Sequence, residues 1–253
     1  MSIYTKLQSL FSVVTVSACL SSSATLIFDT TAVEAQIAKQ YRVITDLRAS
    51  ASGQFSGDEL YKLLAAIPAN KSQIWIIDLR QESHGFIDGI PVSWYSDQNT
   101  GNASKSAAKI HQEENKLLLD LKARKTVQVY PLNKLGGGGV SFGHPVTMIP
   151  ELIESEQELV TSYGAHYKRI YVLDHHKPSD QEVDQFINFV RKMKLQDWLH
   201  FHCRGGKGRS STFVVMYDII RNAHIYSLEH IVLRQVKLGN IQLDKLSARV
   251  DKQ

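Results

Sequence analysis

The sequence predicts an α/β fold in which helices cover both faces of a central, mostly parallel, twisted sheet. After residue 40, short runs rich in β-branched and aromatic residues alternate with segments of helical hydrophobic periodicity. Neither an internal repeat nor a long low-complexity linker interrupts this alternation. Strands interleaved with helices are typical of a sheet buried between two helical layers. Sheets of this kind bind ligands at the carboxyl ends of their strands.

The individual elements follow from composition and periodicity. Buried strands are expected at residues 73–79, 126–132, 169–174 and 198–203. Helices are expected at residues 57–67, 105–125, 149–163, 179–193, 210–222 and 226–237. One helix start has a signal of its own, because Ser179 and Glu182 form a capping box directly after Pro178.

Length and charge indicate the general class of protein. The chain has 253 residues, of which 43% are hydrophobic, and this is enough for a substantial buried core. Its 29 Lys and Arg residues against 25 Asp and Glu give a net charge of +4, without the clustering typical of a nucleic-acid binder. Beyond residue 30 no apolar run reaches the roughly 18 residues of a membrane-spanning helix. We therefore expect a globular protein with no nucleic-acid partner and no transmembrane span.

The first 24 residues have the order of a secretory leader, in which a basic residue precedes an apolar stretch that ends in small residues. Cleavage after Ala24 would leave residues 25–253 as a single secreted or periplasmic domain. The segment VSAC, which ends at Cys19, also resembles a lipoprotein box and would make that residue a lipid anchor. An ordinary buried N-terminal helix is the remaining interpretation. On either export route the folded domain keeps one cysteine, Cys203, and no internal disulfide.

The segment HCRGGKGRSS, residues 202–211, is the centre of the functional prediction. It follows a predicted strand and precedes an amphipathic helix, so it forms a loop that ends at a helix N-terminus. Its glycines allow backbone N–H groups to point inward, and the helix adds free N–H groups and the positive end of its dipole. We expect an anion there, most naturally phosphate. An ATP-binding loop is excluded, because Gly208 rather than Ser or Thr follows Lys207.

Cys203 lies at the floor of this predicted cradle. The amide dipoles, the helix terminus and Arg209 all favour its thiolate over its thiol. The planar guanidinium of Arg209 can hold two phosphate oxygens. One loop thus supplies a nucleophile and an oxyanion clamp. The alternative is that Cys203 is a buried cysteine with a structural role only.

This loop resembles the His-Cys-x5-Arg-Ser/Thr signature of the cysteine-dependent protein tyrosine phosphatase (PTP) superfamily. The resemblance implies that Cys203 attacks phosphorus and forms a cysteinyl-phosphate, which water later hydrolyses. It also implies that Arg209 binds the phosphate, that Ser210 assists breakdown of the intermediate, and that His202 positions the loop. No metal and no organic cofactor are implied.

Cleavage of a phosphate monoester requires a proton donor for the leaving oxygen, so a carboxylic acid should approach from another loop. Asp174 ends a predicted strand and is followed by HHKP, which looks like the general-acid loop of the superfamily. Asp180 and Asp184 are weaker candidates, because acidic residues at a helix start simply favour its dipole. The doublet His175–His176 and the segment HFH at 200–202 invite a metal interpretation, but no spaced set of ligands completes either site.

A second segment narrows the family. WIIDLRQESHGFIDGIPVSWY, residues 75–95, resembles the Asp-Leu-Arg-Gln-Glu-Ser-His-Gly segment of the PTP-like phytases, bacterial enzymes that dephosphorylate myo-inositol hexakisphosphate. With the acid and nucleophile segments in the same order, the similarity spans about residues 40–245. Arg204 and Ser210 stand where these phytases commonly have an acidic or neutral residue and a threonine. Some members carry an additional small β domain upstream, for which little room precedes Asp78.

The resemblance and the extra loop cations imply an inositol polyphosphate substrate. The expected substrate contacts are Arg204, Gly205, Gly206, Lys207, Gly208, Asp78, Arg80 and His175. The equally weighted alternative to the contacts of Asp78 and Arg80 is a hydrogen-bond network of Arg80, Glu82 and His84 that buttresses the strand end. Lys134 and the glycines at 136–139 suggest a mobile connection, and Lys177 and Lys237 are either remote phosphate contacts or ordinary surface lysines.

Two rival functions stay open at this point. One is a phosphatase for phosphotyrosine or membrane phosphoinositides, which would be a delivered bacterial effector if the N-terminus is not a signal. The other is a phosphate-binding module without catalysis.

Overall fold

The computed structural model describes residues 24–29, 37–96, 99–135 and 139–239. Apart from Ala24, the expected leader with Cys19 lies outside the described residues, and so do the glycines at 136–138. Among the described residues, no helix combines the length and the apolar character that crossing a membrane requires.

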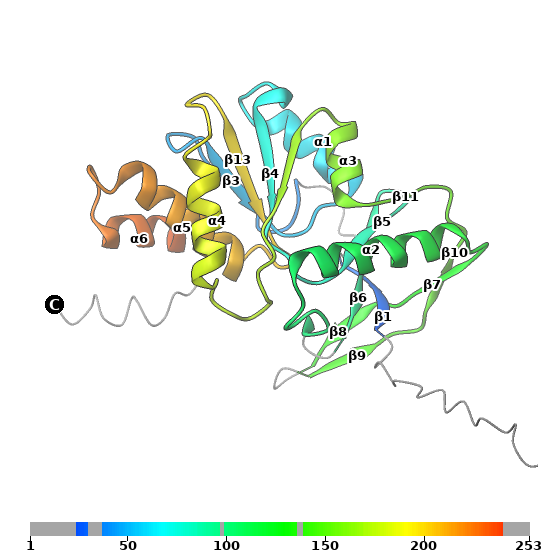
Figure 1. Cartoon of the computed structure of the whole chain (residues 1–253). Helices are drawn as coiled ribbons and strands as arrows, with labels where there is room; N and C mark the ends of the chain where they lie inside the picture. The colour runs from blue at the N-terminus through cyan, green and yellow to red at the C-terminus, as the bar shows by residue number, and fades with distance from the viewer. Residues whose placement is uncertain (1–23, 30–36, 97–98, 136–138, 240–253) are drawn as a thin grey trace, which may run out of the picture.

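A five-stranded, mostly parallel sheet forms the centre of the molecule, as predicted (Figure 1). Its strands, in spatial order, are β12 (His166–Arg169), β4 (Ile74–Asp78), β13 (Trp198–His202), β3 (Ala49–Ser52) and β2 (Arg42–Ile44). Neighbours from β12 to β3 pair in parallel, and only the edge strand β2 is antiparallel. The chain leaves the central strand β13 at Cys203, so the predicted nucleophile lies at the carboxyl edge of the sheet, where such sheets bind ligands.

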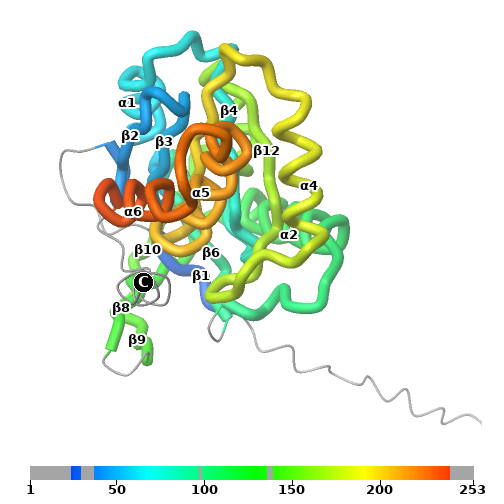
Figure 2. Tube along the Cα trace, turned by 90° about the vertical axis from the view of Figure 1, so that its left-hand side faces the viewer, coloured from blue at the N-terminus to red at the C-terminus, as the bar shows by residue number. Residues whose placement is uncertain are grey.

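Helices cover both faces of this sheet (Figures 1 and 2). One face carries α4 (Asp180–Val190), α5 (Gly208–Asn222) and α6 (Leu228–Gly239), and the other carries α1 (Gly57–Ala66) and α3 (Glu156–Ser162). Phe186 of α4 and Phe213 of α5 pack with Phe201 in one buried cluster. Leu60 of α1 and Leu159 of α3 belong to a second cluster on the opposite face. Burial of large apolar side chains on both faces is the main stabilising contribution to this layered arrangement.

A second, antiparallel sheet was not predicted. Its strands in order are β1 (Thr25–Phe28), β6 (Ile90–Tyr95), β5 (His84–Ile87) and β11 (Ile153–Glu154). The helix α2 (Ala107–Lys122) packs on it through Leu118 and Leu121. Of the four strands of this sheet, only β1 precedes Asp78 in the sequence. The short region before Asp78 therefore does not prevent such a sheet from forming.

Two small ribbons extend this part of the molecule. β7 (Val127–Val129) pairs with β10 (Val146–Met148), and β8 (Leu132–Lys134) pairs with β9 (Val140–Phe142). Figure 2 shows β8 and β9 projecting from the body of the molecule. The predicted strand at 126–132 is thus present as β7, but it lies outside the central sheet.

Two predicted boundaries differ from the structure. The strand expected at 169–174 is β12, which ends at Arg169, so the residues before Asp174 form an extended loop. The helix expected at 149–163 begins only at Glu156, because a capping box of Ser155 and Glu158 starts it there. The capping box predicted at Ser179 is confirmed.

Candidate active site

The segment after β13 forms a loop that ends in the first turn of α5. Lys207 is the N-cap of α5 and makes no side-chain capping hydrogen bond, so the first-turn N–H groups of this helix are available to an anion. Gly206 has a φ of +71°, and a Cβ on it would lie 2.4 Å from the backbone N of Gly53. Only glycine fits there, whereas a Cβ on Gly205 or Gly208 would meet nothing within 4 Å.

Cys203 is buried, with 3% of its surface exposed, and its thiol is free. Its Sγ accepts a hydrogen bond from Ser210 Oγ at 3.2 Å, and the same hydroxyl lies 3.3 Å from the carbonyl of Ser52. The structure therefore brings Cys203 and Ser210 together as the sequence predicts.

Arg209 is fixed by a buried carboxylate. Its two Nη atoms donate to the two oxygens of Glu82 at 2.7 and 2.9 Å, in the bidentate geometry of a guanidinium and a carboxylate. Nη1 also donates to the carbonyls of Leu79 and Val172. Burial alone would raise the pKa of Glu82, but Arg209 and Arg80 outweigh it and hold this pKa below its usual range. Glu82 is thus ionised and holds Arg209 against the loop.

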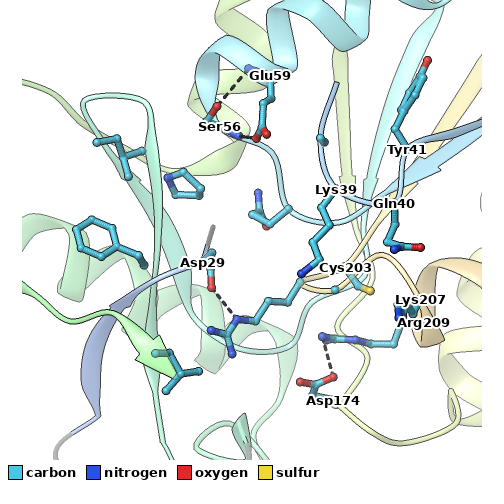
Figure 3. Close-up of a pocket in the computed structure, with 18 of the residues that line it drawn as sticks. Asp29, Lys39, Gln40, Tyr41, Ser56, Glu59, Asp174, Cys203, Lys207 and Arg209 are labelled. Atoms are coloured by element: carbon cyan, nitrogen blue, oxygen red, sulfur yellow. Dashed lines mark hydrogen bonds and ion pairs between the residues drawn. The ribbon is translucent and has the colours of Figure 1, made fainter. Parts of the chain in front are cut away.

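Asp174 lies at the mouth of the same loop, in contact with Arg209. Its Oδ1 is 3.0 Å from Arg209 Nη2, and its Oδ2 accepts a hydrogen bond of 2.9 Å from Asn99 Nδ2 (Figure 3). The side chain is 18% exposed, which is compatible with an acid that meets a substrate from outside. Asn99 is buried and has a φ of 60°, so a strained turn presents its amide to Asp174.

His202 lies behind the loop, fully buried. Its Nε2 is 2.6 Å from Glu156 Oε1, and the other Glu156 oxygen accepts a hydrogen bond from Gln54. Burial is the largest single effect on the pKa of Glu156 and would raise it, but the charge of His202 and the hydrogen bonds from His202 and His84 together lower this pKa to about 2. Glu156 belongs to α3, so this contact ties the residue before Cys203 to a helix on the far side of the sheet.

Asp78 and Arg80 do not line the cleft. Asp78 accepts hydrogen bonds from the hydroxyl of Tyr167 and the backbone N–H of Arg80, and both side chains are fully buried. Arg80 donates to Glu82, Asp29, Gln54 and Ser93. Because every nitrogen of its guanidinium has a protein partner, the expectation of a substrate contact is corrected here in favour of the buttressing network.

Arg204 is also held by a protein carboxylate. Its Nε donates to Asp29 Oδ1 at 2.9 Å, and its guanidinium carbon lies 5.7 Å from the ring centroid of Tyr95. Burial would raise the pKa of Asp29, but Arg80 and Arg204 lower it below its usual range. Asp29 thus joins the end of β1 to the loop, and it neutralises part of the positive charge that the sequence assigns to substrate binding.

The loop opens onto a cleft of about 2980 Å³. Cys203, Arg209 and Asp174 line it together, and Gly205, Lys207 and Gly208 contribute the loop face. Exposed lysines on its wall are Lys39, Lys62, Lys134, Lys177 and Lys207. Figure 3 shows the ammonium end of Lys39 directed toward the loop. The exposed His175 lines the cleft as well, whereas Lys237 lies on α6 and does not.

One buried group has the residue types of a metal site. Ligand atoms of Asp78, His84 and Glu156 lie within 4.8 Å of one another. His84 Nε2 is 3.4 Å from Asp78 and 3.2 Å from Glu156. Burial and Arg80 lower the pKa of His84, yet Asp78 helps raise it to about 9. A protonated His84 between two carboxylates, with Arg169 at 3.0 Å from Asp78, balances this cluster without a cation.

The histidines that invite a metal interpretation are engaged otherwise. The two ring nitrogens of His200 lie 2.9 and 3.0 Å from Ser50 Oγ and Ser52 Oγ. Burial keeps the pKa of His200 well below its usual range. His176 Nδ1 pairs with the carbonyl of Asp174, and His175 Nε2 lies 3.7 Å from the Asp174 carboxylate.

The family follows from a match over more than half of the chain. The family model of the PTP-like phytases, whose description names inositol hexakisphosphate, matches residues 77–221. The chain belongs to the PTP-like phytase family. The matched region contains Glu82, Asp174, Cys203 and Arg209, whereas Asp29 and Lys39 lie upstream of it.

Solved structures of PTP-like phytases share this architecture. The PTP-like myo-inositol phosphatase of Mitsuokella multacida, in complex with myo-inositol-(1,3,4,5)-tetrakisphosphate, is 31% identical with a TM-score of 0.79. The match covers 86% of this chain and 39% of that one. A PTP-like phytase of Bdellovibrio bacteriovorus is 36% identical with a TM-score of 0.70, covering 86% of this chain and 76% of that one. The effector protein hopD2 of Pseudomonas syringae is 29% identical over 198 residues, which are 78% of this chain and 42% of the effector.

Several contacts in this PTP-like phytase fold escape sequence reasoning. Asp29, Lys39, Asn99 and Glu156 come from four separate parts of the chain and meet only in the folded molecule. No motif marks them, and each is a common residue type in an ordinary segment. Glu82 is different, because it lies within the DLRQESHG segment and was foreseen as part of a network.

Proposed function

We propose that the protein is a cysteine-dependent phosphatase that hydrolyses phosphate monoesters of inositol polyphosphates, with phytate as the principal substrate. The observation that carries this proposal is the convergence of three groups on one cleft: Cys203 beneath Ser210, Arg209 clamped by Glu82, and Asp174 at 3.0 Å from Arg209. Membership of the PTP-like phytase family supports the same reaction.

In the first step, the thiolate of Cys203 attacks the phosphorus atom. A sulfur–phosphorus bond forms, the bond from phosphorus to the ring oxygen breaks, and protonated Asp174 gives its proton to the leaving oxygen. The entering phosphate competes with Asp174 for Arg209 Nη2. A phosphate in that position favours protonation of the displaced carboxylate by like-charge repulsion.

In the second step, Asp174 takes a proton from water, and the oxygen of this water attacks phosphorus. The sulfur–phosphorus bond breaks, and inorganic phosphate and the Cys203 thiolate are released. The hydroxyl of Ser210 donates to this sulfur at 3.2 Å, so it stabilises the departing thiolate. His202 contributes by holding the residue before the nucleophile against Glu156.

The surroundings of the loop favour a substrate with several phosphates. Lys39, Lys177 and Lys207 line the cleft with exposed side chains from three different segments. With His175, they are our proposed contacts for phosphates other than the one that reacts. The backbone N–H groups of Gly205 and Gly208 belong to the cradle of the reacting phosphate.

Phosphate release tests this proposal directly. We expect release from phytate that is at least tenfold faster than from a phosphotyrosine peptide or a phosphoinositide. Cys203→Ser should lose several orders of magnitude in turnover and still bind phytate, because only the nucleophile is changed. Wild-type turnover in this variant would exclude the covalent route, and inertness of the wild-type protein toward all three esters would indicate a binding module.

A second candidate substrate is a phosphotyrosine protein, in the setting of a bacterial effector. The effector setting is favoured by the 29% identity to the effector protein hopD2 over most of this chain. Faster release from the peptide than from phytate in the same assay would select it.

Export is a separate proposal that rests on the order of residues in the leader. Intact mass of the protein recovered from its native host distinguishes cleavage after Ala24 from lipidation at Cys19. A mass that retains Met1 or the full leader would contradict export by either route.

A further inference from the structure

Arg42 is a buried cation beneath the loop that the proposed mechanism does not use. It begins the edge strand β2, and only 4% of its surface is exposed. Its Nη1 donates to the carbonyl of Gly206 at 2.9 Å and to the carbonyl of Gln40 at 3.2 Å. Its Nη2 donates to Ser211 Oγ at 2.9 Å. All of these acceptors are neutral.

The other buried arginines of the described part of the chain have carboxylate partners. Arg80 pairs with Asp29 and Glu82, Arg169 pairs with Asp78 and Glu114, and Arg209 pairs with Glu82 and Asp174. No ion pair to a described carboxylate is formed by Arg42. A buried charge is costly unless it is paired, so Arg42 needs a counter-charge of another kind.

The loop that Arg42 holds through the carbonyl of Gly206 also contains Cys203, and the thiolate of this cysteine would supply that counter-charge. Burial lowers the pKa of Arg42 to about 10, and the one charge that acts in the opposite direction is Cys203. Cys203 likewise stabilises the charge of Arg209 from α5. Other titratable groups around Arg42 and Cys203 include His200 and His202 on β13 and Asp174 on the acid loop, together with Lys39, Tyr41, Arg204 and Lys207, which line the same cleft. Burial keeps the pKa of His200 well below its usual range, and Arg42 and Arg209 are the guanidinium groups whose charge Cys203 supports.

The hydrogen bond to Gly206 also sets the direction of one peptide group. In a trans peptide the carbonyl and the following N–H point to opposite sides. Because Arg42 holds the carbonyl of Gly206 on the underside of the loop, the N–H of Lys207 is directed to the opposite side, toward the cradle. The positive φ of Gly206 is what allows this turn.

We propose that Arg42 is a positioning residue of the reaction: it fixes the Gly206–Lys207 peptide with its N–H toward the phosphate, and it supplies a buried positive charge that stabilises the thiolate of Cys203. The expected effect of Arg42 on turnover rests on the proposed phosphatase function. The expected effect of Arg42 on the Cys203 thiolate does not depend on any substrate.

Two substitutions separate the charge of Arg42 from its geometry. In Arg42→Met the charge is lost, so the pH midpoint of Cys203 alkylation by iodoacetamide should rise by about one unit, a tenfold change in thiolate population. Turnover of phytate should fall at least tenfold. In Arg42→Lys the charge stays, so the alkylation midpoint should remain near that of the wild type. Turnover should still fall, because one ammonium does not reproduce the planar fork.

Two controls accompany these variants. Arg48→Met removes a partly buried arginine at the other end of the sheet, where it donates to the carbonyl of Gln196, and should leave both readouts unchanged. Ser211→Ala removes one acceptor and no charge, so it should leave the alkylation midpoint unchanged. A folded Arg42→Met protein with the wild-type alkylation profile would overturn the proposal.

If Arg42→Met is recovered unfolded, Arg42→Gln takes its place, since an amide can still donate to Gly206. Arg42→Lys provides an independent decision, because a rise of its alkylation midpoint would show that charge at this position is not what stabilises the thiolate. A wild-type protein that releases no phosphate from any ester would remove the proposed function, while the alkylation profiles would still decide the role of Arg42.

Discussion

The clamp between Glu82 and Arg209 gives the most quantitative prediction. Glu82→Gln keeps the shape of the side chain but removes its charge. Residue 82 then offers Arg209 one acceptor oxygen in place of two, and its amide N–H₂ group points toward a guanidinium. Breaking a buried, hydrogen-bonded ion pair costs about 3–5 kcal/mol. We expect the lower end of this range, about 3 kcal/mol, because an amide oxygen in the place of Oε1 keeps the hydrogen bonds of 2.9 and 3.0 Å and loses only the one of 2.7 Å.

Stability and turnover should both respond to this change. For a chain of this size, about 3 kcal/mol corresponds to a Tm lower by roughly 6–12 °C. Turnover should fall by about 10²-fold, because the phosphate clamp is no longer held in place. Urea unfolding at pH 7 and the kcat for phytate measure the two effects separately.

The pH dependence has a definite sign. The pKa of Glu82 in the folded protein lies below its ordinary value of 4.5, so its stabilisation is present above pH 4.5 and is lost as the pH falls through the folded-state pKa. The stabilities of the wild type and of Glu82→Gln should therefore converge only in strong acid. The matched control is Glu113→Gln, which removes the partly exposed ion pair with Lys105 and should cost less than about 1 kcal/mol. A Glu82→Gln protein with unchanged stability and kcat would refute the reasoning.

Three further predictions follow from the site. Asp174→Asn should abolish the alkaline limb of the kcat profile for esters with poor leaving groups, and an unchanged profile would assign the proton to another group. The pKa of His84 is raised from 6.5 to about 9, so its contribution of about 3 kcal/mol to the free energy of unfolding is present below pH 6.5 and lost as the pH rises through 9. Urea unfolding of the wild type and of His84→Gln across this pH range measures the contribution. The same dependence of stability on pH in both proteins would contradict it. Arg204→Gln should lower Tm with little effect on KM, because its partner Asp29 is left buried. Lys207→Gln should instead raise KM with little effect on Tm. The reverse pattern would make Arg204 a substrate contact.

The signature loop shows how far local sequence reaches. The strand, the glycines and the following helix are short-range features, so the placement of Cys203, Arg209 and Ser210 around one anion site is predictable from residues 198–222 alone. In the structure Ser210 donates to the sulfur of Cys203, and α5 begins at Gly208, two residues before the predicted start. The acid loop is predictable too, although the strand before it ends five residues ahead of Asp174.

The network behind the loop required the folded molecule. Arg80 and Arg204 carry charges that suit a polyphosphate, and their sequence positions favour substrate contact. Both meet Asp29, a residue from the start of the described chain. The second sheet brings them together, and its strands are too short and too scattered in sequence to be recognised by periodicity.

The sequence by itself determined the fold class, the family resemblance and the residues of the chemistry, because each depends on features within one strand, loop and helix. Tertiary structure decided which charges face the substrate and which are neutralised inside the protein. The physical reason is that the state of a buried arginine depends on the carboxylates it meets, and those come from strands and helices far apart in the chain. The buried position of Arg42, without a carboxylate partner among the described residues, is visible only at that level.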